Sequence, residues 1–302
     1  MTKEKISSRV RKKTEPEDVG RKIRLSAVWE KSEKKMKMRV LIRGAGDLAT
    51  GIAYRLYKCG FEIIMTETFV PLTVRRTVAF SRAVYEGSAE VEGVRAVLIQ
   101  TPDQVENVLE NREIPVLVDP ELEYKSSYRA DVLVDAILAK RNLGTKISDA
   151  ELVIGVGPGF TAGEDCHVVV ETMRGHDLGK VIHKGSAIPN TGVPGVVGGY
   201  SIERLVRAVA DGMFEPLVAI GDFVEKDQII AYSGGKPVRA KMSGIVRGML
   251  QPGLTVKEGM KCGDIDARCE LRHCYTISDK ARAIGGGVLE AIMEHFYFYT
   301  GI

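Results

Sequence analysis

A strand, a glycine-rich turn, a helix and a second strand follow one another over residues 38–67, and this order constrains the fold more than any other feature. Residues 38–42 form a short apolar run, typical of a buried parallel strand. The turn occupies residues 43–51, and apolar side chains then recur every four residues, as on one face of a helix: Leu48, Ile52 and Leu56. Residues 62–67 form the second strand. The segment predicts an α/β fold with a Rossmann-like, doubly wound parallel sheet.

The turn carries small residues at the positions where a dinucleotide-binding fold needs them. Gly44 permits the tight turn, Gly46 lets the backbone approach a pyrophosphate, and Ala49 takes the third small position. Glu67 ends the second strand, where a carboxylate would hold a ribose hydroxyl. Asp47 argues the other way, because a carboxylate at a helix N-terminus competes with phosphate for the same donors. All five are assigned to a predicted cofactor-binding site, and a similar fold whose turn holds no dinucleotide is the alternative.

Two adjacent arginines follow the second strand. Arg75 and Arg76 are expected at the carboxyl edge of the sheet, where open α/β sheets bind their ligands. Paired guanidinium groups suit a phosphate or a carboxylate, so both arginines join the predicted cofactor-binding residues. The alternative is that they lie on a solvated helix face.

Strands and helices go on alternating up to residue 150. Further strands are predicted at 94–100 and 115–119, with a helix between them that opens on a capping box from Thr101 to Gln104. Residues 131–142 are expected to form a strand that runs into a helix. This alternation predicts a Rossmann-like domain over residues 38–150.

A glycine-rich β segment is predicted over residues 151–212, with strands at 152–156, 168–172 and 179–185. It packs five polar side chains into a short stretch: Asp165, His167, Glu171, Arg174 and His176. Because side chains alternate along a strand, His167 and Glu171 share one face. Imidazole and carboxylate together suit acid–base chemistry, so four of the five are candidate catalytic residues and Arg174 is a cofactor-binding one. A polar network that braces the turns is the alternative. Cys166 beside these residues suggests metal binding, but the spacing matches no zinc signature, and no metal site is predicted.

Residues 213–268 contain two versions of one pattern, at 221–231 and 253–265. Each has a Gly, a Val three residues later, a turn residue and an apolar strand. The duplication resembles the barrel-sandwich hammerhead of biotinyl and lipoyl carrier domains. The hairpin around Lys236 lacks the AMKM signature of the modified lysine, so neither biotin nor lipoate is expected.

The last predicted element is a helix over residues 276–296. Ser278 or Asp279 would cap it, and its apolar face would pack back on the first domain. A run of three glycines lowers its helix propensity and permits either close packing or a kink: Gly285, Gly286 and Gly287.

The basic charge of the chain is concentrated in residues 1–37. That tail holds 13 Lys/Arg and 6 Asp/Glu, a net of +7, so the rest of the chain carries 43 − 13 = 30 bases and 40 − 6 = 34 acids, a net of −4. The tail is expected to be disordered; an arm for nucleic acid is the alternative, although no nucleic-acid partner is predicted.

No run is apolar enough for a membrane helix or a signal sequence. The five scattered cysteines are expected to be reduced thiols in a cytoplasmic protein.

Six strings of the sequence together resemble one family: RGAGDLATG, RRTVAFSRAVYEG, GPGFTAGEDCH, ETMRGHDLGKVI, PNTGVPG and TISDKARAIGGGVLEA. The family is the selenium-dependent molybdenum hydroxylase accessory proteins of the YqeB type, which are distantly similar to xanthine dehydrogenase accessory proteins. The resemblance spans residues 38–296. It implies a role in maturing a selenium-containing molybdenum hydroxylase, with the hydroxylase apoenzyme as partner. It brings no established catalytic residue.

The leading hypothesis is a cytoplasmic maturation factor that binds molybdopterin or a dinucleotide at the carboxyl edge of the sheet. The Gly44–Gly46 turn and the two arginines would hold phosphate, and the polar cluster at 165–176 would face the reactive end of the ligand. An NAD(P)-dependent oxidoreductase is a second hypothesis, against which the lack of a Tyr-x-x-x-Lys pair counts. A non-enzymatic scaffold is the third. Catalysis and a homodimeric state are both left open.

Overall fold

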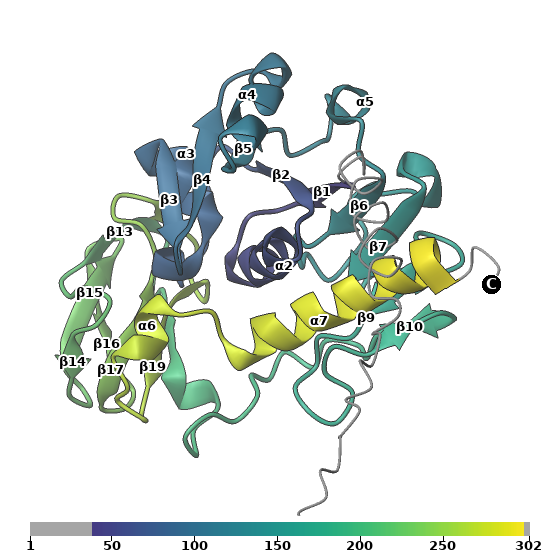
Figure 1. Ribbon diagram of the computed structural model, residues 1–302. Helices are drawn as coiled ribbons and strands as arrows, with labels where there is room; N and C mark the ends of the chain where they lie inside the picture. Colours follow the sequence, from purple (N-terminus) through teal and green to yellow (C-terminus); the bar gives the residue numbers. More distant parts are fainter. Residues whose placement is uncertain (1–37, 299–302) are drawn as a thin grey trace, which may run out of the picture. The chain divides into compact units, whose positions relative to one another are not determined.

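A nine-stranded sheet dominates the part of the chain that the computed structural model describes, residues 38–298 (Figure 1). The strands lie in the order β10-β9-β7-β6-β1-β2-β5-β4-β3. Their bounds are Arg39–Arg43 for β1, Glu62–Glu67 for β2, Ser88–Val91 for β3, Val94–Ile99 for β4, Ile114–Val118 for β5, Val132–Asp135 for β6, Leu152–Val156 for β7, Val168–Val170 for β9 and Val181–Ile182 for β10. Only β3 and β10, at the two edges, pair antiparallel within this sheet. The predicted basic tail, residues 1–37, lies outside the described residues.

The central strand β1 determines where the carboxyl edge of the sheet lies. Its last residue, Arg43, pairs with Thr66 of β2 on one side and with Asp135 of β6 on the other. The chain continues from β1 to β2 on one side, whereas β6 lies on the other side of β1, so the strand order reverses at β1. In open α/β sheets, such a reversal leaves a crevice beyond the carboxyl ends of the strands. The expectation of an α/β unit with a mostly parallel sheet is confirmed.

Helices cover both faces of this sheet. On one face lie α2 (Asp47–Lys58) and α7 (Asp279–Met293), which are neighbours in Figure 1 and share one apolar core with the sheet. On the other face, α4 (Val105–Glu110) and Tyr128 at the end of α5 (Lys125–Tyr128) contribute to a second core. The predicted C-terminal helix is confirmed as α7, and the Ser278 hydroxyl caps it by accepting from the amide of Ala281.

Short elements connect these strands and helices. They are η1 (Arg76–Val78), η2 (Phe80–Arg82), α3 (Ala83–Glu86), η3 (Pro102–Gln104), η4 (Ile147–Asp149), η5 (Ile202–Arg204), α6 (Arg272–Tyr275) and the π-helical turn η6 (Glu294–Phe298). β8 (Thr161–Ala162) and β11 (Gly185–Ser186) form a separate antiparallel pair. The capping box predicted at Thr101 and Gln104 is present.

The helix predicted after β6, within residues 131–142, is wrong. Asp135 accepts a hydrogen bond from the Thr145 hydroxyl at 2.6 Å, and the Asn142 side chain accepts from the amides of Gly144 and Thr145. Leu138 also has a positive φ, which a helix cannot contain. Polar side chains that bond nearby backbone compete with helix formation, and here they hold a loop.

The predicted division at residue 150 does not coincide with an end of the sheet. β7 pairs with β6, β9 with β7 and β10 with β9, so residues 152–182 add three strands to the first sheet. An apolar strand beside the open edge of β6 buries its polar backbone by joining that sheet.

Two four-stranded antiparallel sheets make up the β-rich part of the chain. Their orders are β12-β19-β17-β14 and β16-β15-β13-β18. The bounds are Leu205–Arg207 for β12, Gly212–Pro216 for β13, Phe223–Val224 for β14, Ile229–Ser233 for β15, Lys236–Arg239 for β16, Gly244–Met249 for β17, Thr255–Val256 for β18 and Lys261–Asp266 for β19. A core of their own includes Phe214, Ile230 and Val256. The β-rich antiparallel architecture is confirmed, and the closer likeness to a biotinyl or lipoyl hammerhead stays a prediction.

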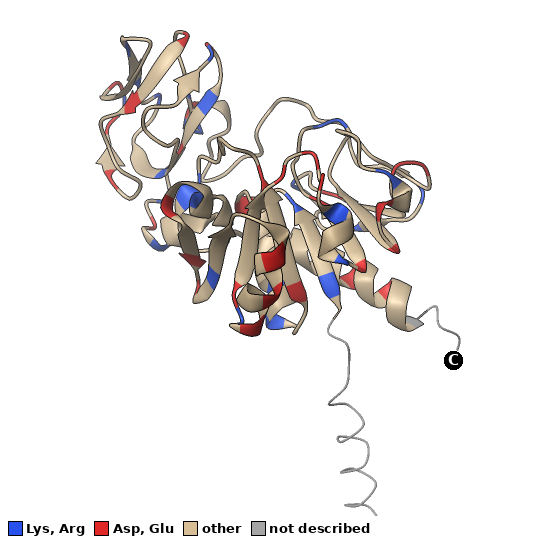
Figure 2. Cartoon of the chain, turned by 90° about the horizontal axis from the view of Figure 1, so that it is seen from above, with Lys and Arg blue, Asp and Glu red and all other residues tan. Residues whose placement is uncertain are grey.

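The segment after β2 ties the β-rich sheets to the parallel sheet. The amide of Met249 donates to the carbonyl of Val74 at 2.7 Å, and Arg76 donates back to the carbonyl of Met249 at 3.1 Å. Figure 2 shows basic and acidic positions interspersed over both parts. Within residues 38–298, no helix is both long and apolar enough to span a membrane.

Candidate functional site

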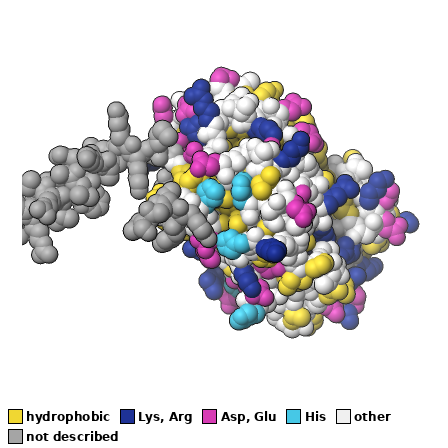
Figure 3. Space-filling view, turned by 90° about the vertical axis from the view of Figure 1, so that its right-hand side faces the viewer, with side chains coloured by type: hydrophobic (Ala, Val, Ile, Leu, Met, Phe, Trp, Pro, Cys, Tyr) yellow, Lys and Arg dark blue, Asp and Glu magenta, His cyan; other side chains and the backbone are white. Residues whose placement is uncertain are grey.

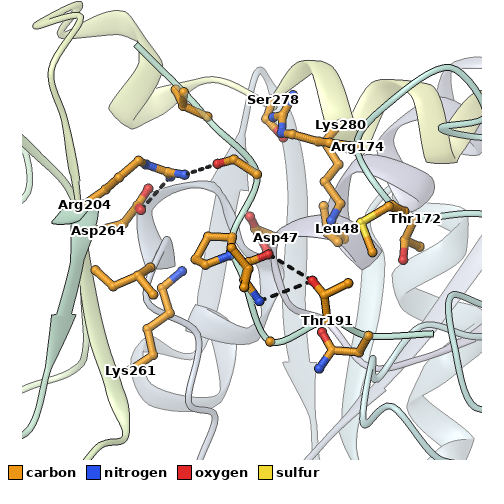
Figure 4. Close-up of a pocket in the computed structure, with 18 of the residues that line it drawn as sticks. Asp47, Leu48, Thr172, Arg174, Thr191, Arg204, Lys261, Asp264, Ser278 and Lys280 are labelled. Atoms are coloured by element: carbon orange, nitrogen blue, oxygen red, sulfur yellow. Dashed lines mark hydrogen bonds and ion pairs between the residues drawn. The ribbon is translucent and has the colours of Figure 1, made fainter. Parts of the chain in front are cut away.

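A cavity of about 500 Å³ lies at the carboxyl edge of the parallel sheet, against the β-rich sheets (Figure 4). One wall comes from the start of α2, the segments after β7 and β9, and the start of α7. The opposite wall comes from η5 and strands β12, β17 and β19. Figure 4 shows Arg204, Asp264 and Lys261 on one side and Arg174 and Lys280 on the other. The loop of residues 190–195 also lines the cavity.

The lining of this cavity is strongly basic. Eight of its residues are Lys or Arg and two are acidic. The bases are Arg75, Lys140, Arg174, Arg204, Arg207, Arg247, Lys261 and Lys280; the acids are Asp47 and Asp264. The part of the chain after residue 37 is slightly acidic in sequence, so this excess is local. Such a concentration of positive charge in a cleft favours an anionic occupant.

Several of these cations are held in place by the fold. Arg75, 6 % exposed, donates to the carbonyls of His273 and Thr276 at 2.9 and 3.0 Å. Arg204 donates to Asp264 at 2.7 Å and to the carbonyl of Gly195 at 3.2 Å, which ties the 190–195 loop to the β-rich wall. On the other wall Arg174 forms a two-pronged ion pair with Asp279, at 2.6 and 2.8 Å.

Lys280 is a partly buried cation of this lining. Burial lowers its pKa, and repulsion from Arg174 adds to the effect. A cation that is partly desolvated beside another cation is stabilised by an anion in the same space.

The glycine-rich turn folds as expected, and its glycines and Ala49 make close contacts within the fold. Gly44 has a φ of +99°, and a side chain there would meet the carbonyl of Ala136 at 3.2 Å. A side chain at Gly46 would meet the Thr73 hydroxyl at 3.4 Å. Ala49 belongs to α2 and is buried in the core that this helix shares with the sheet. These small residues let the turn approach β6 and the segment after β2.

Glu67 closes the turn instead of extending beyond it. Its carboxylate accepts hydrogen bonds from the amide of Ala45 at 3.0 Å and from that of Thr68 at 2.8 Å. Burial raises the pKa of Glu67. In a dinucleotide-binding fold, the amide of Ala45 would be expected to point at phosphate, but here it donates to the carboxylate of Glu67. This arrangement does not favour the oxidoreductase hypothesis.

The two adjacent arginines have different surroundings. Arg75 lines the cavity beside Asp47, whose carboxylate lies 3.4 Å away. Arg76 does not line it and donates to the carbonyl of Met249, and burial lowers its pKa. Of the twelve predicted site residues, Asp47, Arg75 and Arg174 line the cavity.

The four candidate catalytic residues do not line this cavity. Asp165 accepts from Asn142 and from the amide of Thr161, and so braces a loop. Glu171, 1 % exposed, accepts from the amides of Thr172, Met173 and Ile188. His176 is exposed, and His167 lines a different cavity. The contacts of Asp165 and Glu171 correspond to the bracing alternative.

His167 belongs to a second cavity of about 390 Å³, and Figure 3 shows histidine side chains gathered on one face of the molecule. His167 and His295 lie edge to face with ring centres 5.9 Å apart, and His183 pairs with Glu294 at 3.3 Å. His167 Nδ1 accepts from the amide of Val153 at 2.9 Å. Burial lowers the pKa of His167, and His295 adds to this effect.

No three His, Cys, Asp or Glu side chains within residues 38–298 are grouped so that they could hold a metal ion. All five cysteines are free. Burial raises the pKa of Cys166 and of Cys262 to about 11, so these thiols stay protonated and unreactive at neutral pH.

Sequence reasoning missed most of the basic lining. Arg204, Arg207, Arg247 and Lys261 lie in the β-rich part, where the sequence resembles carrier domains and predicts no ligand. One signal could have found the cavity: all six strings that carry the resemblance contribute lining residues, among them Asp47, Arg75, Pro158, Arg174, Thr191 and Lys280.

Comparison with known proteins gives one close relative in sequence. The chain is 50% identical over 254 residues to the Escherichia coli K12 protein described as "Uncharacterized protein YqeB". This match covers 84% of the chain and 47% of YqeB, so the chain spans about half the length of that relative. No protein-family model matches the chain.

Solved structures give only weak likenesses. An aspartoacylase family protein from Mesorhizobium loti has a TM-score of 0.24 and 10% identity, over 76% of this chain and 85% of that one. A succinylglutamate desuccinylase/aspartoacylase from Rhodobacter sphaeroides has a TM-score of 0.22 and 14% identity, over 76% and 85%. Scores this low carry no argument about fold or function. The informative finding is the sequence similarity to YqeB over most of the chain.

Proposed function

We propose that this chain binds an anionic, cofactor-like small molecule of the molybdopterin or nucleotide type in the basic cavity. We propose further that binding serves the maturation of a selenium-dependent molybdenum hydroxylase in the cytoplasm, with the hydroxylase apoenzyme as partner. The supporting observation is the convergence of the six strings on one cavity lined by eight bases and two acids. The link to molybdenum and selenium comes from the resemblance of those strings.

The position and size of the cavity support a small-molecule ligand. A Rossmann-like sheet binds ligands beyond the carboxyl ends of its strands, where this cavity lies. Its volume of about 500 Å³ is within the range of small-molecule sites, roughly 300–1,000 Å³. Molybdopterin and nucleotides carry phosphate, which the lysines and arginines of the lining can bind.

Thermal melting of the full chain tests the binding proposal. The probes are molybdopterin, a nucleoside monophosphate and the corresponding phosphate-free nucleoside. A ligand at about 100 times its Kd stabilises a protein by about 2.7 kcal/mol, so the phosphate-bearing probes should raise Tm and the nucleoside should not. An unchanged Tm with every phosphate-bearing probe at saturating concentration would overturn the proposal.

A matched pair of lysine variants locates the ligand. Lys261 and Lys236 are both exposed and each begins a strand, but only Lys261 lines the cavity. Lys261→Gln should reduce the ligand-induced rise in Tm, whereas Lys236→Gln should leave it unchanged. Equal responses of both variants would place the ligand elsewhere.

The maturation role needs a test in cells. Deletion of the gene for this chain should abolish the activity of the selenium-dependent hydroxylase while the amount of apoenzyme stays constant. Full hydroxylase activity in the deletion strain would contradict that part of the proposal.

A further inference from the structure

Arg247 on β17 is a buried cation without adequate partners. Its side chain lines the cavity and is 8 % exposed, yet within residues 38–298 it donates no hydrogen bond, and its Nε is buried without a hydrogen-bond partner. A guanidinium has five N–H donors, and buried polar groups in native proteins are normally satisfied. This unsatisfied arginine therefore calls for an explanation.

Two nearby acids lie at ion-pair distance from Arg247 but form no hydrogen bond with it. Its Nη1 lies 3.6 Å from Asp264 and its Nε 3.9 Å from Asp266, distances longer than hydrogen bonds. Asp264 is bound by Arg204 at 2.7 Å, and Asp266 is bound by both prongs of Arg268, at 2.9 and 2.6 Å. Both carboxylates are thus committed to other arginines.

A second arginine, Arg75, lines the same cavity. Gly248, next to Arg247, has no side chain, and an added Cβ would lie 3.2 Å from Cγ of Arg75. Arg75 therefore packs directly against β17. Burial lowers the pKa of Arg247, and the charge of Arg75 lowers it further. Two like charges held together at the edge of a cavity are costly to the empty protein and favourable to an anion between them.

We propose that Arg247 and Arg75 form the subsite for a terminal phosphate monoester of the ligand. The inference rests on the proposed function and specifies the chemical class of its ligand. The two guanidinium groups approach from different elements, β17 and the segment after β2. A tetrahedral phosphate dianion offers acceptors in several directions and can be bound by both, whereas a carboxylate accepts only in its plane.

Arg247 contributes little to the empty fold by this argument. Substitution with Gln removes a desolvated charge, and Asp264 and Asp266 keep their partners Arg204 and Arg268. In chloride buffer the Tm of Arg247→Gln should therefore equal or exceed that of the native chain. A residue that only stabilised the fold would lower Tm when replaced.

Isothermal titration of the full chain at constant ionic strength tests the subsite. The probes are inorganic phosphate, cytidine monophosphate and cytidine. Phosphate and the monophosphate should compete with each other, and cytidine should not displace phosphate. Arg247→Gln should weaken both phosphate-bearing probes by about 10- to 100-fold, as for a lost hydrogen-bonded charge. Arg239→Gln, on the exposed strand β16 outside the cavity, is the control and should bind as the native chain does.

Arg247→Lys keeps the test decisive if the Gln variant does not fold. It retains the charge but loses the fork, so it should bind phosphate more weakly than the native chain. Native affinity in either Arg247 variant would overturn the subsite.

If molybdopterin binds the native chain and Arg247→Gln equally, the proposed function stands and the subsite falls. If phosphate binding depends on Arg247 but molybdopterin does not bind, the subsite stands and the proposed function falls.

Discussion

Neighbouring residues in this chain have different roles because the backbone turns them toward different surroundings. Arg75 faces the basic cavity, whereas Arg76 reaches the carbonyl of Met249 in the β-rich part. Asp165 and His167 are similarly separated, the first in a loop brace and the second in the histidine cavity. The residue types suggested sites, but their directions depended on segments distant in sequence.

Glu171 is predicted to act as a brace. Its two carboxylate oxygens accept from three backbone amides, two after β9 and one at Ile188, ahead of the 190–195 loop. Glu171→Gln replaces an acceptor with a donor that faces an N–H, so we expect a loss of about 1–3 kcal/mol in the free energy of unfolding. Urea denaturation measures it, and hydrogen exchange should show faster exchange at 188–195. Unchanged stability would contradict the bracing role.

His167 predicts a dependence of stability on pH. Its folded pKa lies below its unfolded value of 6.5, because burial disfavours the charged imidazolium and His295 adds to this effect. The unfolded chain therefore binds more protons just below pH 6.5, and the free energy of unfolding falls as the pH drops, by up to about 1.4 kcal/mol per pH unit.

The control for this prediction is His167→Asn, whose side-chain oxygen can replace Nδ1 as acceptor. His183, His295 and Glu294 face the same cavity in both proteins, so the difference between the two proteins isolates His167. Denaturant unfolding between about pH 7 and 5 should show a smaller slope for the variant. Parallel curves for the two proteins would show that His167 makes no contribution.

At the scale of elements, glycines in α7 and in its neighbour α2 allow close packing, although glycine lowers helix propensity. An added side chain at Gly287 would overlap the carbonyl oxygen of Gly179, and one at Gly51 on α2 would lie 2.6 Å from Cβ of Ala281. A side chain at Gly286 would meet nothing within 4 Å. Two of these three glycines therefore allow α7 to lie against its neighbours.

Alanine at two adjacent positions of α7 should have opposite effects. Gly287→Ala must displace backbone and should destabilise the fold by about 1–3 kcal/mol or more. Gly286→Ala restores helix propensity without a clash and should stabilise by about 0.5–1 kcal/mol. Thermal and urea unfolding of the two variants measure the difference, and a destabilised Gly286→Ala would contradict the described packing of α7.

At the scale of the whole molecule, the cavity requires both parts of the described chain. Arg174 and Lys280 come from the parallel-sheet part, and Arg204, Arg247 and Lys261 from the β-rich part. Saturation with inorganic phosphate should slow hydrogen exchange on both walls, at residues 172–174 and at 204–207 and 261–264. Protection of one wall alone would show that the anion does not bridge the two parts.

Much of the fold was predictable from local signals. The apolar runs at 38–42 and 152–156, the turn at 43–51 and the capped C-terminal helix each follow from short-range patterns of side chains, and the structure confirms them. The helix after β6 was wrong because Asp135 and Asn142 bond the nearby loop, a competition that periodicity does not reveal. Strand pairing across residue 150 was not predictable either, since the pairing of β7 with β6 depends on which edge of the sheet is open.

The sequence by itself determined the order of the elements, the small residues of the turn and the slightly negative net charge of the chain after residue 37. Only the tertiary structure decided which cations meet. Arg75 and Arg247 are 172 positions apart in the chain and belong to separate patterns, yet the packing of Gly248 against Arg75 sets both at one cavity. Electrostatic interaction depends on distance in space and on burial, and neither follows from spacing along a chain.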